Sequence, residues 1–301
     1  MPLTQEQIQK RYEFIDKVEN LSAKIPWPVK SGFAGQACKE SGFGTSIFYN
    51  NYMGIKCHDS KKYAGCRIGK TGEVINGVLH DNLKLAFQTY NNLEECRDDY
   101  IIILNYVDKN GFDRYKRARQ SRCYQEFCYY IKACGYATGL KYDSSLRNDY
   151  IVPYNLFELD LHRPYKSDIL QGYGYLKWYE AFATVKLPNG QVFQRAIEPP
   201  QIYWENINRV AIEFQKIRSY YNLPIQVDSF YRVTDYNNTL AGHSDKSMHL
   251  IALAIDLKPL WRINIIDFYK KVKEITNFKG FGIGSNYLHC DLREKESLWY
   301  Y

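Results

Sequence analysis

The spacing of three potential metal ligands constrains the fold of this chain more than any other feature. His249 and Asp256 lie seven residues apart, the aspartate within an apolar run, and His289 follows near the C-terminus. Two histidines and one carboxylate are enough protein ligands for a catalytic zinc site that keeps an open coordination position. The sequence therefore predicts that the last third of the chain folds so that these side chains converge on one zinc ion.

Length and charge narrow the remaining possibilities. A chain of 301 residues is expected to form two domains. Its longest apolar runs, such as residues 100–104, fall far short of the roughly 20 residues that a membrane helix needs, so no membrane insertion is expected. The polar N-terminus predicts no signal peptide. The net charge of +7 comes from basic residues interspersed with acidic ones, which argues against nucleic-acid binding.

Cysteines are concentrated in the first half. Seven of the eight lie between Cys38 and Cys134, and no C-x-x-C pair occurs, so a structural zinc knuckle is not expected. Cys57 and Cys66 could bridge a hairpin. Because thiols stay reduced in a cytoplasm, we expect free buried cysteines instead.

The first half is predicted to be mainly helical. Apolar residues recur at helical spacing over residues 4–23, and the Pro26-Trp27-Pro28 cluster ends that helix. Ser31 can cap a second helix that ends at Glu40. A carboxyl group there is exposed to both desolvation and the negative end of the helix. Both effects raise its pKa toward the range of a general acid.

The segment after this helix is punctuated by glycines. Residues 71–77 contain Thr-Gly-Glu and Asn-Gly, which predict a β-hairpin or lobe that carries Glu73. A helix with an acidic start is expected from Leu93, and a last pair of helices brackets residues 134–138.

Five ordered motifs in this half resemble a known family, the bacterial mannosyl-glycoprotein endo-β-N-acetylglucosaminidases that cut peptidoglycan glycan strands. The motifs are residues 37–44, 51–56, 71–73, 87–91 and 135–138. The resemblance covers about residues 5–158 and implies a lysozyme-like α domain with a small β lobe.

The same resemblance implies roles for individual residues. Glu40 would be the general acid and Glu73 the second carboxylate that glycoside hydrolysis requires. Tyr136 would line the sugar cleft, with Asn51 and Tyr52 as further substrate contacts. Alternatively, Glu73 is only an exposed residue of the hairpin, and Tyr136 only packs at the end of a helix.

The second half is predicted to be a small α+β domain. A hairpin turns at residues 188–190, a long amphipathic helix follows Pro200, and a strand covers residues 224–232. A helix over residues 264–275 and a closing strand with His289 complete the pattern.

This half resembles the zinc D-Ala-D-Ala carboxypeptidase and murein endopeptidase family. The similarity rests on residues 229–232, 247–249, 254–256 and 288–291 and covers roughly residues 175–295. It implies His249, Asp256 and His289 as zinc ligands. Arg232 would polarise the substrate carbonyl or grip a carboxylate, and Ser247 would contact the substrate.

Two departures from this family pattern matter. Ala252 replaces a glycine, a change that we expect a strand end to absorb. Asn286 stands where related enzymes often have an acid, so the general base is unassigned. Asp291 is our candidate for that base, with the alternative that it only orients His289.

The chain is thus expected to be α+β, with domains at residues 1–160 and 196–301 and a linker with a hairpin at 161–195. The predicted function is a bifunctional peptidoglycan hydrolase of a bacteriophage, either an endolysin released through a holin or a virion tail lysin. The alternative is a structural phage-tail protein, with other tail proteins as partners, that binds the cell wall through degenerate hydrolase domains. His58, His80 and His162 are expected to be ordinary core or surface residues, and His243 is left out of the ligand set.

Overall fold

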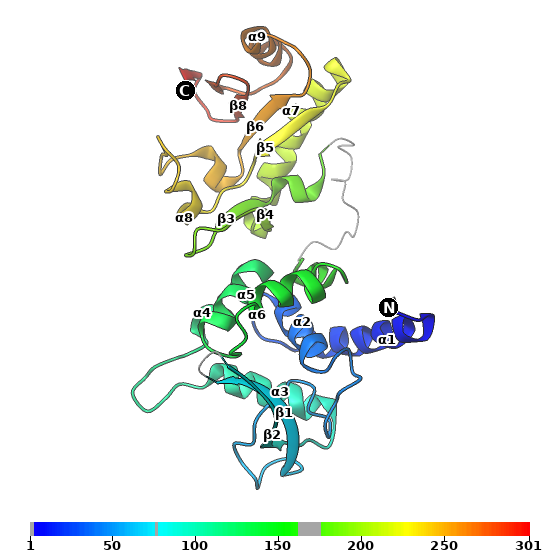
Figure 1. The fold of residues 1–301 in the computed structure, drawn as a ribbon. Coiled ribbons are helices and arrows are strands. Elements are labelled where there is room, and N and C mark those ends of the chain that lie inside the picture. The colour runs from blue at the N-terminus through cyan, green and yellow to red at the C-terminus, as the bar shows by residue number, and fades with distance from the viewer. Residues whose placement is uncertain (1–2, 76–77, 162–175) are drawn as a thin grey trace. The chain divides into compact units, whose positions relative to one another are not determined.

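The computed structural model describes residues 3–75, 78–161 and 176–301, without the side chains of residues 73–75, 79 and 81. The chain divides into two compact units, residues 1–162 and 163–301 (Figure 1). Most of the expected linker, with His162, lies outside the described residues. The predicted α+β character is confirmed, since helices dominate the first unit and the second contains a sheet.

The first unit is helical apart from one two-stranded antiparallel sheet. Its elements are α1 (Gln5–Ser22), α2 (Lys30–Glu40), β1 (Cys66–Ile75), β2 (Val78–Gln88), α3 (Leu93–Asn105), α4 (Lys116–Arg119), α5 (Tyr124–Ala133), α6 (Tyr142–Ser145), η1 (Leu146–Ile151) and η2 (Leu156–Asp160). The start of α1 is fixed by a capping box, in which Thr4 and Gln7 each accept a hydrogen bond from the other's backbone N–H.

Helix α2 forms the centre of this unit, with every residue from 31 to 38 buried. Gly32 and Gly35 permit this packing, because a Cβ atom at either would lie within 2.6 Å of a Phe127 or Ile151 side chain. The expected cap at Ser31 is wrong, since the helix begins one residue earlier. The N–H and hydroxyl of Ser31 instead donate to Asp160. The helix ends at Glu40 as predicted, so the carboxylate lies at the edge of the core.

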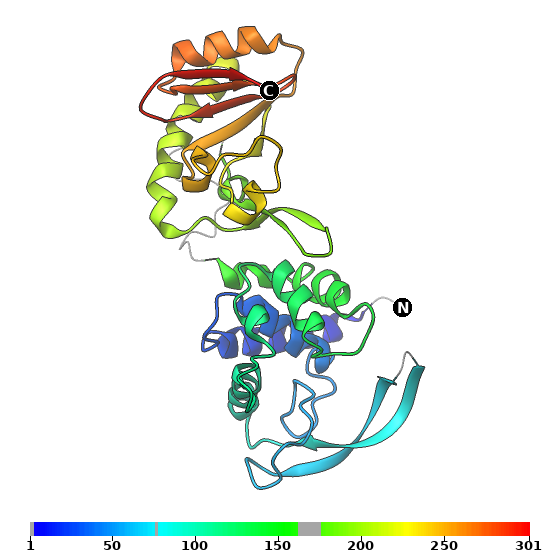
Figure 2. The same cartoon turned by 90° about the vertical axis from the view of Figure 1, so that its left-hand side faces the viewer.

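The β1–β2 hairpin projects from the helices of the first unit as a long ribbon (Figure 2). A disulfide between Cys57 and Cys66 ties the loop before β1 to the base of this hairpin, which corrects the expectation of free thiols there. The loop returns to β2, where the N–H of Cys57 donates to the carbonyl of Ala86, and this brings the two cysteines together. The other six cysteines are free thiols, as expected.

The second unit contains a hairpin, a five-stranded sheet and two long helices. Its elements are η3 (Trp178–Ala181), β3 (Ala183–Lys186), β4 (Val192–Ile197), η4 (Gln201–Tyr203), α7 (Trp204–Tyr221), β5 (Ile225–Ser229), α8 (Thr234–Asn237), η5 (Met248–Ile251), β6 (Ala254–Pro259), α9 (Ile265–Ile275), β7 (Gly280–Ile283), β8 (Leu288–Asp291) and β9 (Ser297–Tyr300).

The sheet has the strand order β5-β6-β8-β7-β9, and only the β7–β9 pair is parallel. Helix α9 packs on the sheet through Tyr269, whose ring lies 5.2 Å from that of Phe281 in β7. Helix α7 packs beside α9 through Tyr221 and Phe268, with ring centroids 5.4 Å apart. The predicted hairpin, long helix, strand and C-terminal helix are all present, whereas β9 was not predicted.

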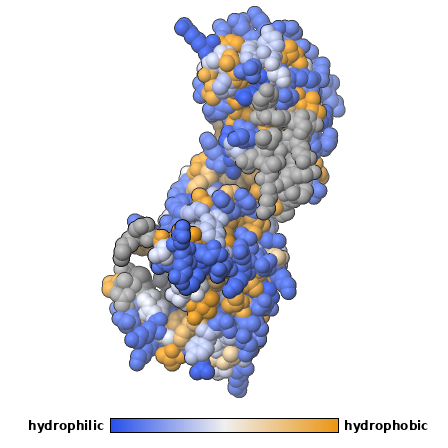
Figure 3. Space-filling view, turned by 90° about the vertical axis from the view of Figure 1, so that its right-hand side faces the viewer, coloured by the Kyte–Doolittle hydropathy of each residue, from blue (hydrophilic) through white to orange (hydrophobic). Residues whose placement is uncertain are grey.

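The described part of the chain contains no candidate membrane-spanning helix. No helix there combines the length and apolarity needed to cross a bilayer. The face in Figure 3 mixes hydrophilic residues with smaller hydrophobic areas.

Candidate active sites

The predicted metal ligands of the second unit lie on one row across the sheet. Ser229 of β5 pairs with Asp256 of β6, Asp256 pairs with His289 of β8, and His289 pairs with Gly282 of β7. Directly paired residues point to the same face of a sheet, so these side chains are neighbours. The row ends at Trp299 of β9, whose ring lies 5.2 Å from the imidazole of His289.

His249 joins this row from outside the sheet. It lies in the short helix η5, just before β6, and is fully buried. Its Nε2 lies 3.1 Å from His289 Nδ1 and 3.2 Å from Asp256 Oδ1, and the last two atoms are 2.8 Å apart. Tetrahedral zinc with bonds of 2.0–2.1 Å places its ligand atoms about 3.3 Å apart. The spacing of the three atoms therefore fits a zinc ion.

In both histidines, the ring nitrogen that points away from the cluster faces an oxygen atom. The other ring nitrogen therefore directs its lone pair toward the centre of the cluster. His249 Nδ1 faces the carbonyl oxygen of Phe230, which can only accept, so Nδ1 carries the hydrogen. His289 Nε2 lies 2.9 Å from the carboxylate of Asp291 and donates to it in the same way. With both rings neutral, two nitrogen lone pairs and a carboxylate oxygen face one another without a donor. A bound cation would resolve this arrangement.

The electrostatics of the cluster follow from its burial. Burial lowers the pKa of His249 to about 4, which favours the neutral ligand form. Burial alone would raise the pKa of Asp256, but the adjacent His249 and His289 hold it well below its ordinary value. Burial likewise opposes the charged form of His289, yet the hydrogen bonds to Asp256 and Asp291 prevail and raise its pKa. A cation that binds here must displace the proton that these carboxylates favour on His289.

The metal-ligand cluster opens into a cavity of about 940 Å³. Arg232 and Ser247, both predicted site residues, line this cavity together with His249, Asp256 and His289. The guanidinium of Arg232 donates to Asp256 Oδ2 at 2.5 Å and to the hydroxyl of Ser229 at 2.9 Å. Arg232 is thus fixed beside the metal ligands with part of its side chain exposed to the cavity.

Asp291, the candidate general base, is fully buried and has both carboxylate oxygens engaged. It accepts from His289 and from two nitrogens of Arg293, at 2.7 and 2.5 Å. These bonds outweigh the effect of burial and lower the pKa of Asp291. Asp291 is not among the described residues that line the cavity. The geometry therefore favours the alternative in which Asp291 orients His289.

The position and backbone conformation of Ala252 differ from the strand end that was expected. It does not lie at a strand end but follows η5, with φ of 55° and ψ of 34°. A left-handed backbone conformation is costly for a residue with a Cβ atom, which explains why a glycine is usual in this motif. Asn286 lies exposed in the turn between β7 and β8.

The first unit contains a second site around Glu40. The hydroxyl of Tyr142 donates to Glu40 Oε1 at 2.6 Å. Tyr142 in turn accepts from the amide of Gln36 at 3.0 Å, and Gln36 accepts from the hydroxyl of Tyr100 at 2.5 Å. Because each hydroxyl has one hydrogen to donate, this chain of bonds directs the hydrogen of Tyr142 toward the carboxylate.

Glu40 and Tyr136 line one cavity of about 950 Å³. The segment of residues 50–56 brings them together. The carbonyl of Met53 accepts a hydrogen bond from Tyr136, and the backbone of Gly54 passes close to Glu40, with 3.6 Å from a Cβ built on Gly54 to Glu40 Oε2.

Two other predicted residues of this site, Glu73 and Asn51, have a less direct relation to the cavity than Glu40 and Tyr136. Glu73 is in β1 at a bulge, immediately after Thr71 and Gly72, which line the cavity; only its backbone is described. Asn51 borders the cavity, but its amide is bonded to the backbone of Ile55 and Gln88 and so holds the loop.

Tyr52 was expected to contact substrate, and the structure corrects this. Its side chain is 1% exposed and packs in the hydrophobic core between Phe14 and Phe33. Its neighbours Asn51 and Met53 both line the cavity, so adjacent residues of one motif have different environments.

Tyr142 and His58 line the cavity around Glu40 but were not predicted as site residues. Tyr142 contacts Glu40 from α6, 102 residues further along the chain. His58 lines the cavity although it was expected to be an ordinary residue. No local pattern marks either of them, because both depend on contacts between distant segments.

These features define a class of two-unit protein with one cavity that contains the carboxylate of Glu40 and one cluster of three side chains that could hold a metal ion. Residues 17–156 match the family model of mannosyl-glycoprotein endo-β-N-acetylglucosaminidase, and residues 183–291 match that of peptidase M15. The chain thus carries an N-terminal glucosaminidase-family domain and a C-terminal peptidase M15 domain, which confirms both resemblances.

Several solved structures are similar to this chain. A peptidoglycan hydrolase mutant from Sphingomonas sp. A1 is 22% identical over 50% of this chain and 99% of its own, with a TM-score of 0.42. The catalytic domain of the autolysin Auto from Listeria monocytogenes is 22% identical over 53% and 90%, with a TM-score of 0.41. N-acetylmuramoyl-L-alanine amidase from Staphylococcus aureus is 16% identical over 85% and 78%, with a TM-score of 0.45. None of the curated proteins matches the chain.

Proposed function

We propose that this protein is a bifunctional peptidoglycan hydrolase that cuts glycan strands with its first unit and stem or cross-link peptides with its second. The observation that carries the proposal is that the two segments matched by different hydrolase families contribute all described lining residues of one cavity and most of those of the other. Cutting both strand and cross-link loosens a polymer mesh faster than either cut alone.

In the glycan site, Glu40 is the general acid that protonates the leaving oxygen, and Glu73 is the second carboxylate. Tyr142 supports the first role because its hydroxyl donates to Glu40 and stabilises the carboxylate that forms when the proton leaves. Tyr136 lines the path of the sugar chain beside Glu40. The separation of the two acids would decide between retention and inversion at the anomeric carbon.

In the peptide site, His249, Asp256 and His289 would hold one zinc ion, which when bound supplies Lewis-acid polarisation and lowers the pKa of water. His249 and His289 are oriented for this by Phe230 and Asp291. The Arg232 guanidinium is positioned to grip a substrate carboxylate or carbonyl, and Ser247 contacts the substrate at the cavity wall.

The test is mass spectrometry of muropeptides after digestion of purified peptidoglycan, because it identifies both cleaved bonds. We expect Glu40→Gln to lose glycan cleavage by about 10²–10⁴-fold and keep peptide cleavage. His249→Ala should show the reverse. If the wild-type protein cuts neither bond but still sediments with the wall, the structural tail-protein alternative replaces this proposal.

We further propose a bacteriophage lysin as the setting, because a phage has to open the cell wall during entry or release and a chain that cuts both glycan and peptide bonds would serve that purpose. Immunodetection in purified virions would identify a tail lysin, and detection only in lysates an endolysin. Expression from a bacterial chromosome without a prophage would contradict both.

A further inference from the structure

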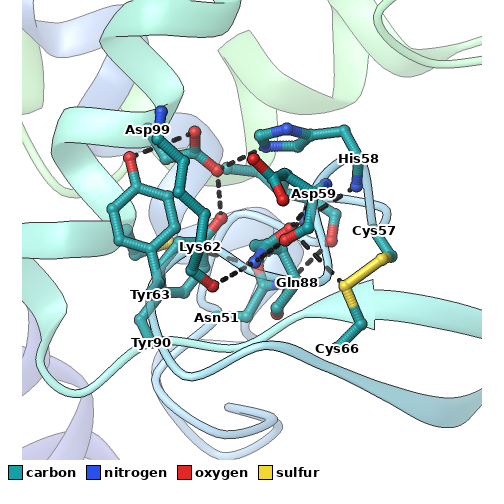
Figure 4. Close-up of polar contacts among 12 residues, drawn as sticks. Asn51, Cys57, His58, Asp59, Lys62, Tyr63, Cys66, Gln88, Tyr90 and Asp99 are labelled. Carbon is teal, nitrogen blue, oxygen red and sulfur yellow. Dashed lines mark hydrogen bonds and ion pairs between the residues drawn. A yellow bond between two sulfur atoms is a disulfide. The ribbon is translucent and has the colours of Figure 1, made fainter.

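The cavity lined by Glu40 and Tyr136 is called the glycan cavity below. Close to its lining residue His58, a buried carboxylate has three hydrogen-bond partners. Asp99 of α3 is 0% exposed and accepts from the hydroxyl of Tyr90 at 2.7 Å and from that of Tyr63 at 3.3 Å. His58 Nε2 lies 2.7 Å from the same carboxylate (Figure 4). A buried charge is stable only when it is paired and hydrogen-bonded, so all three groups donate to Asp99.

This arrangement fixes the tautomer and orientation of His58. Since Nε2 donates its hydrogen to Asp99, the neutral ring has its lone pair on Nδ1. Among the described residues, none forms a hydrogen bond with Nδ1. The side chain of His58 is 38% exposed and lines the same cavity as Glu40, Thr71 and Gly72. An oriented acceptor is therefore accessible from the glycan cavity.

The loop that carries His58 is held more firmly than an ordinary surface loop. Cys57, the preceding residue, is bonded to Cys66. The buried side chain of Gln88 donates to the carbonyls of Asp59 and Lys62, both at 3.1 Å, and accepts from the N–H of Asp59 at 3.3 Å (Figure 4). The disulfide and these bonds limit the loop's freedom, which reduces the entropy lost when the imidazole binds a ligand.

We propose that His58 is a substrate-contacting residue of the glycan cleft, whose Nδ1 accepts a hydrogen bond from a hydroxyl or acetamido N–H of the glycan strand. Asp99 is its positioning residue, and the loop tied by the disulfide supports both. This inference rests on the proposed glycan-cleaving function and adds a contact that is separate from Glu40 and Tyr136.

The test separates a substrate contact from a structural one. In His58→Gln, the new amide can still donate to Asp99 but has no acceptor at the place of Nδ1. We expect KM for glycan to rise about 3- to 10-fold with kcat within about twofold and an unchanged melting temperature. In a Glu40→Gln background, the same change should weaken binding of a soluble N-acetylglucosamine tetramer by a similar factor.

Matched variants test the positioning role. Asp99→Asn should raise KM as His58→Gln does, whereas Asp98→Asn, which weakens an ion pair with Arg97 on the same helix and touches neither His58 nor Asp99, should leave KM unchanged. Tyr63→Phe removes a donor to Asp99 without altering Nδ1, and should lower the melting temperature but not affect KM.

A wild-type KM and tetramer affinity in His58→Gln would overturn the role of His58 alone. So would an equal rise of KM in Tyr63→Phe, because a loosened loop would then explain the effect. A wild-type chain that neither binds nor cleaves glycan would instead overturn the proposed function, and the role of His58 with it.

Discussion

At the scale of single residues, the contact between Tyr142 and Glu40 gives the sharpest prediction. The hydroxyl donates to the carboxylate and so favours its ionised form. In Tyr142→Phe, Glu40 should stay protonated to higher pH, so the alkaline limb of the glycan-cleavage profile should move upward. The maximal rate should fall about tenfold, because the carboxylate formed during the reaction loses a donor.

A pH–rate profile on purified glycan strands measures both effects. Tyr129→Phe is the matched control, since that hydroxyl has no hydrogen-bond partner among the described residues, and its profile should match the wild type. A profile of Tyr142→Phe with lower rates but an unmoved alkaline limb would mean that Tyr142 affects packing rather than the protonation of Glu40.

Residue-scale prediction from the sequence succeeded where one short motif specifies one contact. The convergence of His249, Asp256 and His289 follows from such motifs. It failed where neighbours within a motif have different environments, since Asn51 lines the cavity and Tyr52 packs in the core. The left-handed backbone at Ala252 was also missed, because an alanine gives no local sign of a conformation that glycine prefers.

At the scale of elements, the disulfide between Cys57 and Cys66 supports the loop at the base of the β1–β2 hairpin. Its cysteines are nine residues apart, and closing a loop of this length stabilises a folded domain by about 2–3 kcal/mol. A Cys57→Ser/Cys66→Ser double variant should therefore lose about this much unfolding free energy in urea. Reductant should cause the same loss in the wild type and no further loss in the double variant. Equal stability of all samples would contradict a supporting role for the bond.

Most elements could be predicted from periodicity and breakers, as α1, α7 and α9 illustrate. Strand β9 could not, because it is four residues long and pairs in parallel with β7, so its identity depends on a partner rather than on its own pattern. The start of α2 was misplaced for a similar reason. Ser31 resembles a cap locally, but Asp160, 129 residues away, takes its hydrogen-bonding groups.

At the scale of the whole molecule, the described residues that line each cavity all belong to one unit. The two activities should therefore be separable by removing the metal. 1,10-Phenanthroline should abolish peptide cleavage and leave glycan cleavage within about twofold of its original rate. Loss of both activities would indicate that the first unit also depends on a metal.

Zinc should also stabilise only one of the two units, since the ligands His249, Asp256 and His289 all belong to the second. A ligand at a hundredfold excess over its Kd adds about 2.7 kcal/mol to the stability of the domain that binds it. In calorimetry, zinc should thus raise one thermal transition by several degrees and leave the other unchanged. His249→Ala should remove this shift, because two ligands hold the ion far more weakly than three, while Glu40→Gln should retain it. A zinc-dependent shift that persists in His249→Ala would place the ion elsewhere in the chain.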